Sequence, residues 1–541
     1  MSNPPSPGTS LTKQQLWWTP LQNRVFAMLW LAWMTSNICM WMSDVAASWM
    51  MTSLSNSPIM VALIQTASNL PVFLMGLPSG ALADIVNRKK YFVITQIWLA
   101  GVAALLCFFT FVGSLSAELL LVLTFMNGIG LAMRWPVFAA IIPDLVNREQ
   151  LPAALALNGM AMNASRIIGP LVAGALIASA GTEYVFALNM VLSLAITVVI
   201  MQWKYQADVS TLPGERFLGA IRVGIQYVKS SSRMRAVLIR IFLFFVQSSA
   251  LMALLPIIAK EHFSGDAGTF TLLLSSLGFG AVISGAQLPW LRLRFDRNQL
   301  VFMGQVILSA SAIGVVLAPN LWIAAPLMMI NGAAWIITAN SLSIAAQFAL
   351  PSWIRARGMS IFQMSLMGGS AIGAAVWGKL ADSTDVTVSV ICGSIFGFIA
   401  VLGTNHLKIE GGTEEDLTPV CPIEHAIPDR NIDHDEGPVM ISVEYQIDPN
   451  HMQEFKKLMK QSKNARLRQG AMSWSLFEDA EKEGKILEYF VFETWADYLR
   501  RFDRFTTNDL NLQDERFSFH LGDTAPIITR RVASRLKESD N

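Results

Sequence analysis

Long apolar runs alternate with short polar segments along most of the chain. Each run is long enough to cross a bilayer as a helix, which takes about 20 residues. The pattern predicts two sets of six membrane-spanning helices, separated by an amphipathic linker at 204–234. The first set is expected at residues 24–51, 58–82, 91–113, 118–142, 151–180 and 184–203. The second set is expected at residues 235–258, 268–291, 299–318, 321–348, 356–380 and 386–406.

The pattern changes after Leu407. Residues 408–438 are acidic and rich in proline, which is typical of a linker without a core. Residues 439–533 then read as a small α+β domain. Its strands are expected at 439–447, 471–479, 486–494 and 527–532, and its helices at 448–468, at 495–505 and after Thr507. This order is ferredoxin-like. The chain therefore divides into an N-terminal segment at 1–23, two helical halves at 24–203 and 235–407, the two linkers, and this domain.

Basic residues gather in alternate loops between the predicted spans. One set of loops holds Arg88, Lys89, Lys90, Arg148, Arg292, Arg294, Arg297, Arg355 and Arg357, and the other holds almost only Lys260 and Lys379. Positive charge in short loops marks the cytoplasmic side of a membrane. We therefore expect a multi-pass protein of a bacterial-type plasma (inner) membrane, with both termini in the cytoplasm.

Composition agrees with a membrane protein and excludes several other classes. Hydrophobic residues make up 53% and charged residues 15%, with a mean hydropathy of +0.44. The net charge is +1 and no basic stripe is interleaved with aromatics, so no nucleic acid partner is expected. Three of the four cysteines lie inside spans, which argues against a disulfide framework.

Metal and nucleotide chemistry is also not expected. Cys421, His425 and His434 lie in the acidic linker without the spacing of a tetrahedral metal site. No phosphate-binding glycine loop with its lysine is present, which argues against a nucleotide-driven pump. We expect no metal and no cofactor.

The two predicted halves repeat each other. Phe125-Met-Asn-Gly128 matches Met329-Ile-Asn-Gly332 at an offset of 204 residues, and the same offset pairs Gly169 with Gly373. A parallel repeat of two six-span halves predicts a substrate path between them at mid-membrane.

A charged stretch at 80–90 separates the second and third predicted spans. It resembles the loop at the same place in the major facilitator superfamily, matching it at Gly80, Leu82, Ala83, Asp84, Arg88 and Lys89. Asn87 stands where glycine is usual, and asparagine tolerates the left-handed backbone conformation. The resemblance implies a cytoplasmic gate formed by Gly80, Asp84, Arg88 and Lys89. The alternative is a set of loop charges that stay in water.

The fifth predicted span contains Gly169-Pro170-Leu-Val-Ala-Gly174. Proline kinks a helix and glycine permits close helix approach. The segment resembles the antiporter signature of exporters in the same superfamily, with Ala173 in place of one glycine. This resemblance favours export over uptake, whereas the alternative is a packing and kink element only.

Asp44, Arg134 and Arg166 are charged residues that lie within predicted spans. Each costs about 2.5–3.5 kcal/mol at mid-membrane, so we expect them to face the bundle interior. They are candidates for substrate or proton coupling, with a structural pair or a snorkelling Arg134 as the alternative. The coupling arginine of proton-linked relatives corresponds here to Thr124, so Arg134 or Arg166 would have to replace it.

The C-terminal domain resembles the extension of the transmembrane secretion effector, or enterobactin-exporter-like, branch. The residues that carry this resemblance are Arg466-Leu-Arg-Gln-Gly470-Ala471, Trp474, Glu488, Trp495 and Arg504-Phe-Thr506. Its topology is also that of the antibiotic biosynthesis monooxygenase-like dimeric α/β barrels, in which dimerisation covers the open sheet face. A dimer through this domain is therefore expected, and the two tryptophans are expected in its core.

These features together predict a secondary transporter that exports a small amphipathic compound, drug- or siderophore-like, by proton antiport. Its expected partners are this small molecule, protons and the lipid bilayer. Two alternatives use the C-terminal domain: a membrane-tethered monooxygenase-like enzyme and a ligand sensor. Twelve spans in two halves exceed what a membrane anchor needs, so we expect a transporter rather than an enzyme.

Overall fold

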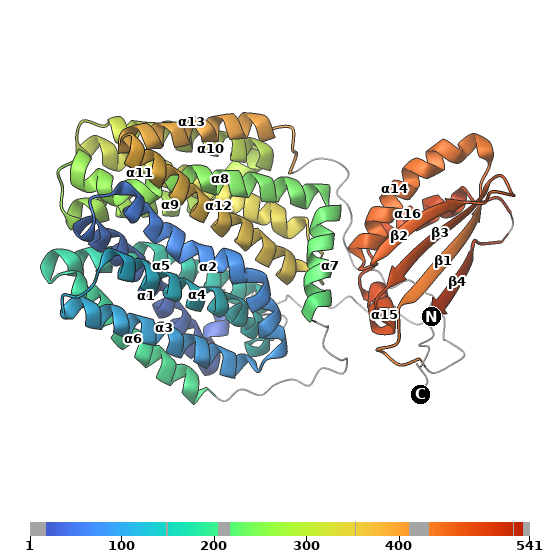
Figure 1. Ribbon diagram of the computed structural model, residues 1–541, viewed down its shortest axis with the longest axis horizontal. Coiled ribbons are helices and arrows are strands. Elements are labelled where there is room, and N and C mark those ends of the chain that lie inside the picture. Colours follow the sequence, from blue (N-terminus) through green and yellow to red (C-terminus); the bar gives the residue numbers. More distant parts are fainter. Residues whose placement is uncertain are drawn as a thin grey trace, which may run out of the picture.

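The computed structural model describes residues 18–147, 150–203, 217–351, 353–409, 432–522 and 524–533. It contains a helical bundle and a separate α+β domain, with helix α7 between them (Figure 1). The first half of the bundle consists of α1 (Arg24–Leu54), α2 (Pro58–Ile85), α3 (Arg88–Phe111), α4 (Ala117–Leu145), α5 (Leu151–Ser179) and α6 (Thr182–Gln202). The second half consists of α8 (Ser232–Ile257), α9 (Ala267–Arg294), α10 (Arg297–Leu317), α11 (Leu321–Phe348), α12 (Arg355–Ser383) and α13 (Val386–Thr404).

All twelve predicted spans are present, and within the described residues twelve helices are long and apolar enough to cross a membrane. Their ends differ from the apolar runs by a few residues because capping, rather than hydrophobicity alone, ends a helix. Helix α3 begins at Arg88, three residues before its apolar run, because the Asn87 side chain accepts a hydrogen bond from the Lys90 amide.

Asn87 corrects one expectation about the charged stretch. Its φ is −53°, so it does not adopt the left-handed conformation that glycine would supply. Asparagine serves here as the N-cap of α3. The substitution of glycine by asparagine therefore exchanges backbone freedom for a side-chain cap.

The two halves contact each other mainly through α2 against α12 and α5 against α9. Glycines allow α2 and α12 to approach closely. A Cβ atom at Gly76 would lie 2.7 Å from Met364 Cγ, and one at Gly368 would lie 2.6 Å from the Phe73 ring. Small residues at helix crossings are the usual means of packing inside a membrane.

Helix α7 (Phe217–Ser230) forms part of the linker between the halves. It packs against α2 of the first half, against α8 and α12 of the second half, and against α14 of the C-terminal domain. Figure 1 shows α7 standing across the end of the bundle that faces this domain. The amphipathic character expected of 204–234 therefore corresponds to a helix with neighbours on both sides.

The C-terminal domain has the expected order of elements. They are β1 (Val439–Gln446), α14 (Met452–Arg468), β2 (Ser473–Glu478), β3 (Lys485–Phe492), α15 (Trp495–Asp503), α16 (Thr507–Ser518) and β4 (Ile527–Val532). The strands form one antiparallel sheet in the order β2-β3-β1-β4, which is the ferredoxin-like arrangement. Gly470 ends α14 with a φ of +108°, a conformation that favours glycine.

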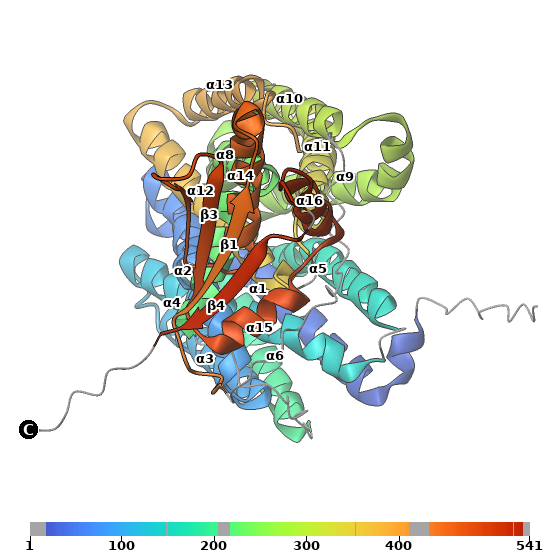
Figure 2. The same ribbon diagram turned by 90° about the vertical axis from the view of Figure 1, so that its right-hand side faces the viewer.

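The helices of this domain cover one face of its sheet. Figure 1 and Figure 2 show α14 and α16 on the side turned toward the bundle, with the other sheet face turned away from it. Trp495 is 5% exposed and lies in the core, as expected, whereas Trp474 is half-buried beside it.

Candidate functional site

Polar side chains of α1, α2 and α12 meet between the two halves at mid-depth in the bundle. Asp44 of α1 accepts a hydrogen bond from Ser68 of α2, with an Oγ–Oδ1 distance of 3.2 Å. On the same helix, Gln65 and Asn69 lie one turn apart, and both donate to the Ser370 hydroxyl of α12, at 2.8 and 3.0 Å. We call Asp44, Gln65, Ser68, Asn69 and Ser370 the polar band. It contains Asp44, one of the in-span charges identified in the sequence.

Sequence reasoning identified Asp44 but missed the rest of the polar band. Gln65, Ser68 and Asn69 interrupt the apolar run 58–82 at spacings of three and four residues, which places them on one helix face. That spacing was the available signal. Ser370 gave no comparable signal, because a single serine in a span usually hydrogen-bonds its own helix.

Arg166 of α5 lies between aromatic rings from both halves. Its guanidinium carbon is 3.7 Å from the ring centroid of Trp335 on α11 and 5.6 Å from that of Trp41 on α1. Within the part of the chain that the structure describes, no ion pair joins Arg166 to Asp44. The two charges therefore lie in separate surroundings, Arg166 near the middle of α5 and Asp44 nearer the end of α1 that leads to α2.

Arg134 of α4 has a different environment from Arg166. It is 1% exposed, donates to Ser36 Oγ and to Asn37 Oδ1 of α1, the latter at 3.3 Å, and lies over the Trp33 ring. All these partners belong to the first half of the bundle. Arg134 therefore links α4 to α1, and none of these partners belongs to the other half.

The antiporter-like segment of α5 makes two close helix contacts. A Cβ atom at Gly169 would lie 2.5 Å from Trp41 Cβ, so this glycine lets α1 approach α5. At Gly174 a Cβ atom would collide with the Thr271 side chain of α9, in the other half. Pro170 lies inside α5 between these contacts. The segment thus packs α5 against both halves.

The halves are also joined at the end of the bundle away from the C-terminal domain. Ser57 donates to Asp382 at 2.5 Å, Lys260 donates to the Thr52 carbonyl oxygen, and Trp49 stacks on Phe270 with centroids 6.0 Å apart. Together with the Gly174 contact, these interactions close the bundle at that end.

The candidate gate residues lie where α2 meets α3, at the end of the bundle near α7. Gly80 lies opposite Ser360 of α12, so the gate stretch adjoins the other half. Asp84 belongs to the last turn of α2, although its side chain is outside the described part. Arg88 and Lys89 form the first turn of α3.

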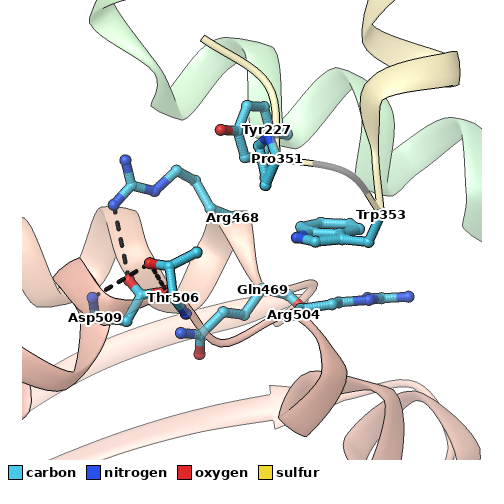
Figure 3. Close-up of a pocket in the computed structure, with 8 residues that line it drawn as sticks. All are labelled: Tyr227, Pro351, Trp353, Arg468, Gln469, Arg504, Thr506 and Asp509. Atoms are coloured by element: carbon cyan, nitrogen blue, oxygen red, sulfur yellow. Dashed lines mark hydrogen bonds and ion pairs between the residues drawn. The ribbon is translucent and has the colours of Figure 1, made fainter. Parts of the chain in front are cut away.

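The C-terminal domain docks on α7 and on the segment between α11 and α12. Arg222 forms an ion pair with Glu493 at 2.5 Å, and Gln226 donates to the Ala471 carbonyl oxygen at 2.6 Å. The Arg504 guanidinium lies 4.9 Å from the Trp353 ring centroid (Figure 3). These three contacts connect the domain to the linker and to the second half.

A small pocket lies within this docking interface. It is lined by Tyr227, Pro351, Trp353, Arg468, Gln469, Arg504, Thr506 and Asp509 (Figure 3). Its volume of about 10 Å³ has room for about one water molecule. Trp353 Nε1 and both polar atoms of the Gln469 side chain are buried without a hydrogen-bond partner among the described residues. The interface is therefore polar, and some of its buried donors and acceptors lack hydrogen-bond partners among the described residues. These features are typical of an interface between domains that can separate.

The interior of the C-terminal domain contains a buried ionic network beside its apolar core. The Glu488 carboxylate, 0% exposed, accepts hydrogen bonds from Tyr445, Ser462 and Trp474 at 2.9–3.0 Å, and it pairs with Arg466 and Arg516 at 3.5 and 3.1 Å. Burial alone would raise the pKa of Glu488, but the two arginines and these hydrogen bonds lower it to about 2. A carboxylate so fully bonded is a structural group rather than a general base.

No metal centre is visible in the described ranges, where no three or more His, Cys, Asp and Glu side chains gather in a group that could hold a metal ion. Cys421 and His425 lie outside the described residues.

Comparison with known families and proteins assigns the chain to a group of membrane transporters. Residues 16–538 match the family model described as transmembrane secretion effector. The staphyloferrin A transporter of Staphylococcus aureus is 21% identical over 277 residues, which are 51% of this chain and 70% of that protein. Macrolide efflux protein A of Streptococcus pyogenes is 22% identical over 262 residues, 48% of this chain and 65% of that protein.

The enterobactin exporter of Salmonella typhi aligns over a longer part of the chain. It is 24% identical over 380 residues, which are 70% of this chain and 90% of that protein. Among solved structures, a bacterial homologue of the human lysosomal transporter Spinster, inward-facing and unoccupied, has a TM-score of 0.56 at 16% identity. It covers 72% of this chain and 97% of its own. This likeness establishes the major facilitator fold of the bundle.

Proposed function

The chain belongs to the transmembrane secretion effector family of the major facilitator superfamily, and from this premise we propose that it exports a small amphipathic compound by proton antiport. The observation that carries the proposal is the polar band between the halves. Polar groups inside a membrane are costly, and they commonly mark a substrate or ion path. In a transporter built from two halves, this path lies at their interface near the midplane.

Alternating access is the mechanism that the helix contacts support. The bundle is closed at the end away from the C-terminal domain by Ser57, Thr52 and Trp49 with their partners in the other half. Separation of these contacts would open that end. Formation of contacts around the gate residues Gly80, Asp84, Arg88 and Lys89 would close the opposite end. A carboxylate such as that of Asp84 contributes about 0.3–1 kcal/mol to such a contact when it lies at a helix N-terminus.

Proton coupling is assigned to Asp44 in this proposal. A carboxylate in the bilayer interior is favoured only when it is paired, hydrogen-bonded or protonated. The Asp44 carboxyl has one hydrogen-bond partner, Ser68, and no ion pair among the described residues. It lies beside the surface between the halves, so the change of access would alter its contact with water and release or take up its proton.

Export is favoured over uptake by two observations. Gly169, Pro170 and Gly174 resemble the antiporter signature, and two of the relatives carry efflux or export in their names. We place both termini in the cytoplasm, because the basic loops lie at the end where α7 and the C-terminal domain meet. The proposal places the protein in the plasma (inner) membrane.

Transport in inverted membrane vesicles tests this function. Vesicles that contain the full chain are energised to make a pH gradient, and uptake of a macrolide, of staphyloferrin A and of enterobactin is measured with and without an uncoupler. We expect uncoupler-sensitive accumulation of at least one of them. Accumulation that persists after the gradient is abolished would refute proton antiport, and absence of accumulation for all amphipathic compounds tried would refute export.

A further inference from the structure

The guanidinium group of Arg166 is stacked on one side and open on its edges. Its central carbon lies over the Trp335 ring at 3.7 Å. A guanidinium is planar and carries five N–H donors in its own plane, so a ring against its face leaves these donors directed outward. The contact with Trp335 therefore stabilises the cation without using its hydrogen bonds.

These donors have no acceptor within the described residues. Neither a hydrogen bond nor an ion pair of Arg166 occurs there, and its nitrogens are absent from the set of fully enclosed, unpartnered polar atoms. Arg134 Nε, by contrast, belongs to that set. The side chain of Arg166 is half-buried, so its donors face accessible space at mid-depth in the bundle.

Among the side chains that the structure describes, none supplies a counter-charge to this cation. Asp44, the in-span carboxylate on the neighbouring helix α1, is bonded to Ser68 and makes no ion pair with Arg166 in the part described. Aromatic rings offset part of the cost of burying a cation. An anion that entered the space beside Arg166 would supply the missing charge and accept the unused hydrogen bonds.

The rings beside Arg166 are held in place by packing from both halves. Trp335 contacts Phe244 and Phe245 of α8, with ring centroids 6.2 and 5.5 Å away. Trp41 is fixed against α5 by the close approach at Gly169. A ligand bound here would touch the first half through Arg166 and Trp41 and the second half through Trp335.

We propose that Arg166, together with Trp41 and Trp335, binds the anionic head of the transported compound. The substrate class is an amphipathic anion, in which a carboxylate or similar planar oxyanion is attached to an apolar, aromatic-compatible body. The oxyanion accepts hydrogen bonds from the edge of the guanidinium, and the body lies against the exposed part of the indoles. This assignment rests on the proposed export function and specifies its substrate.

Three matched probes test the charge preference by direct binding. The full chain is placed in nanodiscs of phosphatidylcholine, and 2-naphthoate, 2-naphthamide and 2-naphthylmethylammonium are titrated by calorimetry, with empty nanodiscs subtracted. We expect the anion to bind about tenfold or more tightly than the neutral amide, and the cation to bind least, because hydrogen bonds between charged partners are the strong ones. Equal affinity for the anion and the amide would overturn the proposal.

Variants of Arg166 locate the preference. Arg166→Gln removes the charge and is expected to make the anion and the amide bind equally, whereas Arg166→Lys keeps the charge but loses the planar fork and is expected to retain part of the preference. Lys379→Gln removes an exposed cation of α12 and serves as the matched control, with the preference unchanged. If Arg166→Gln retains the full preference of the parent, the proposal is wrong. If Arg166→Gln does not fold, the Arg166→Lys variant provides the test. A ratio of anion to amide affinity equal to that of the parent would then contradict a site in which the planar guanidinium binds the oxyanion.

Two further measurements distinguish this inference from lipid binding and from the proposed export function. If phosphatidylglycerol added to the nanodiscs abolishes naphthoate binding to the parent, a lipid headgroup is the ligand, and the substrate assignment is overturned. In inverted vesicles, transport of the amide as fast as the naphthoate would refute the inference and leave export intact. Selective binding of the anion without any transport would refute export and leave an Arg166 anion site.

Discussion

Arg134 and Arg166 carry the same charge in the same half of the bundle, yet their surroundings differ. The donors of Arg134 are directed at Ser36 and Asn37 of α1, whereas Arg166 lies on Trp335 of the opposite half. The sequence named both as coupling candidates. The tertiary contacts place Arg134 against α1 of its own half and Arg166 against Trp335 of the other half.

Asp44→Asn is expected to separate proton coupling from folding. Asparagine keeps the shape and can still accept from Ser68, so the variant should insert and remain stable. We expect export driven by a pH gradient to fall by about tenfold or more, because the variant has no proton to exchange with the gradient. Efflux in inverted vesicles at matched protein levels measures this, with Glu118→Gln at the start of α4 as the control. Parent-like efflux by Asp44→Asn would remove Asp44 from the mechanism.

Glu488→Gln is expected to destabilise the C-terminal domain. The variant leaves Arg466 and Arg516 buried without their counter-charge, which costs about 3–5 kcal/mol of unfolding free energy. Hydrogen exchange of β1 and β3 in the full chain measures the change. Glu478→Gln is the control, because its pair with Lys456 lies at the surface and is worth about 0–1 kcal/mol.

The same carboxylate predicts the pH dependence of this domain. Its pKa is lowered from 4.5 to about 2 in the folded protein, so its contribution to stability is present in full above the unfolded pKa of 4.5. It is lost as the pH falls through the folded pKa of about 2. Protection of the β1 and β3 amides against exchange, relative to their intrinsic exchange rate at each pH, should therefore fall below pH 4.5, and the Glu488→Gln variant should lack this component. The same acid dependence in both proteins would contradict the assignment.

At the scale of the element, α5 and α7 are the helices that connect separate parts of the molecule. Helix α5 carries Gly169 against α1 and Gly174 against α9, and α7 lies between the bundle and the C-terminal domain. The kink expected from Pro170 is accompanied by these two close contacts, which the sequence motif did not specify. A helix in contact with both halves must change its contacts when the halves move.

Gly174→Ala is expected to impair transport more than folding. The added methyl group would collide with Thr271 and hold α5 away from α9 at the closed end. Export should fall several-fold, and Thr271→Gly in the same chain should restore it, because the collision involves the Thr271 side chain. Gly159→Ala is the matched control on the same helix, since its Cβ would meet nothing within 4 Å. Normal export by Gly174→Ala would contradict this prediction, because the contact between α5 and α9 would then rearrange without any loss of transport.

At the scale of the whole molecule, the C-terminal domain is attached to the transporter through a small polar interface. The ion pair Arg222–Glu493 joins side chains that are 35% and 32% exposed, so its contribution is at most about 1 kcal/mol. Helix α7 also contacts α2 and α12, the helices that pack the two halves together. Docking of the domain is thus connected, through α7, to the two helices that pack the halves together.

Charge reversal tests this docking. Arg222→Glu places two carboxylates together and is expected to release the domain in part, seen as faster hydrogen exchange in α7 and near Ala471. The double variant Arg222→Glu with Glu493→Arg should restore the parent exchange rates. If the single reversal leaves exchange unchanged, the domain is held by other contacts.

The open sheet face predicts self-association of the full chain. Phe477 is 52% exposed and stacks on Tyr489, and Ile527 of the edge strand β4 is 65% exposed. Exposed apolar side chains on one sheet face are expected to be covered by a second copy. Light scattering in detergent should give a dimer for the parent and a monomer for Phe477→Lys. A monomeric parent would contradict this expectation.

Local properties of the sequence determined most of the fold. The number of spans and their ends follow from the length of apolar runs, and the order of strands and helices after residue 439 follows from hydrophobic period and capping. These signals act within a few residues of each other. The same signals also indicated Asp44 and Arg166, because a charged residue inside an apolar run can be recognised without knowledge of its partners.

The contacts of each polar residue could not be predicted from its neighbours in the chain. Ser370 meets Gln65 and Asn69 across about 300 positions of sequence, and Trp335 meets Arg166 across the two halves. Asn87 caps a helix instead of adopting the conformation of glycine, and the C-terminal domain docks on α7. Such contacts arise from packing between helices far apart in the chain, where the free energy depends on shape and on every neighbour at once. The hydrophobic pattern of the sequence determines the helices and strands, and packing between these elements determines what their charged side chains contact.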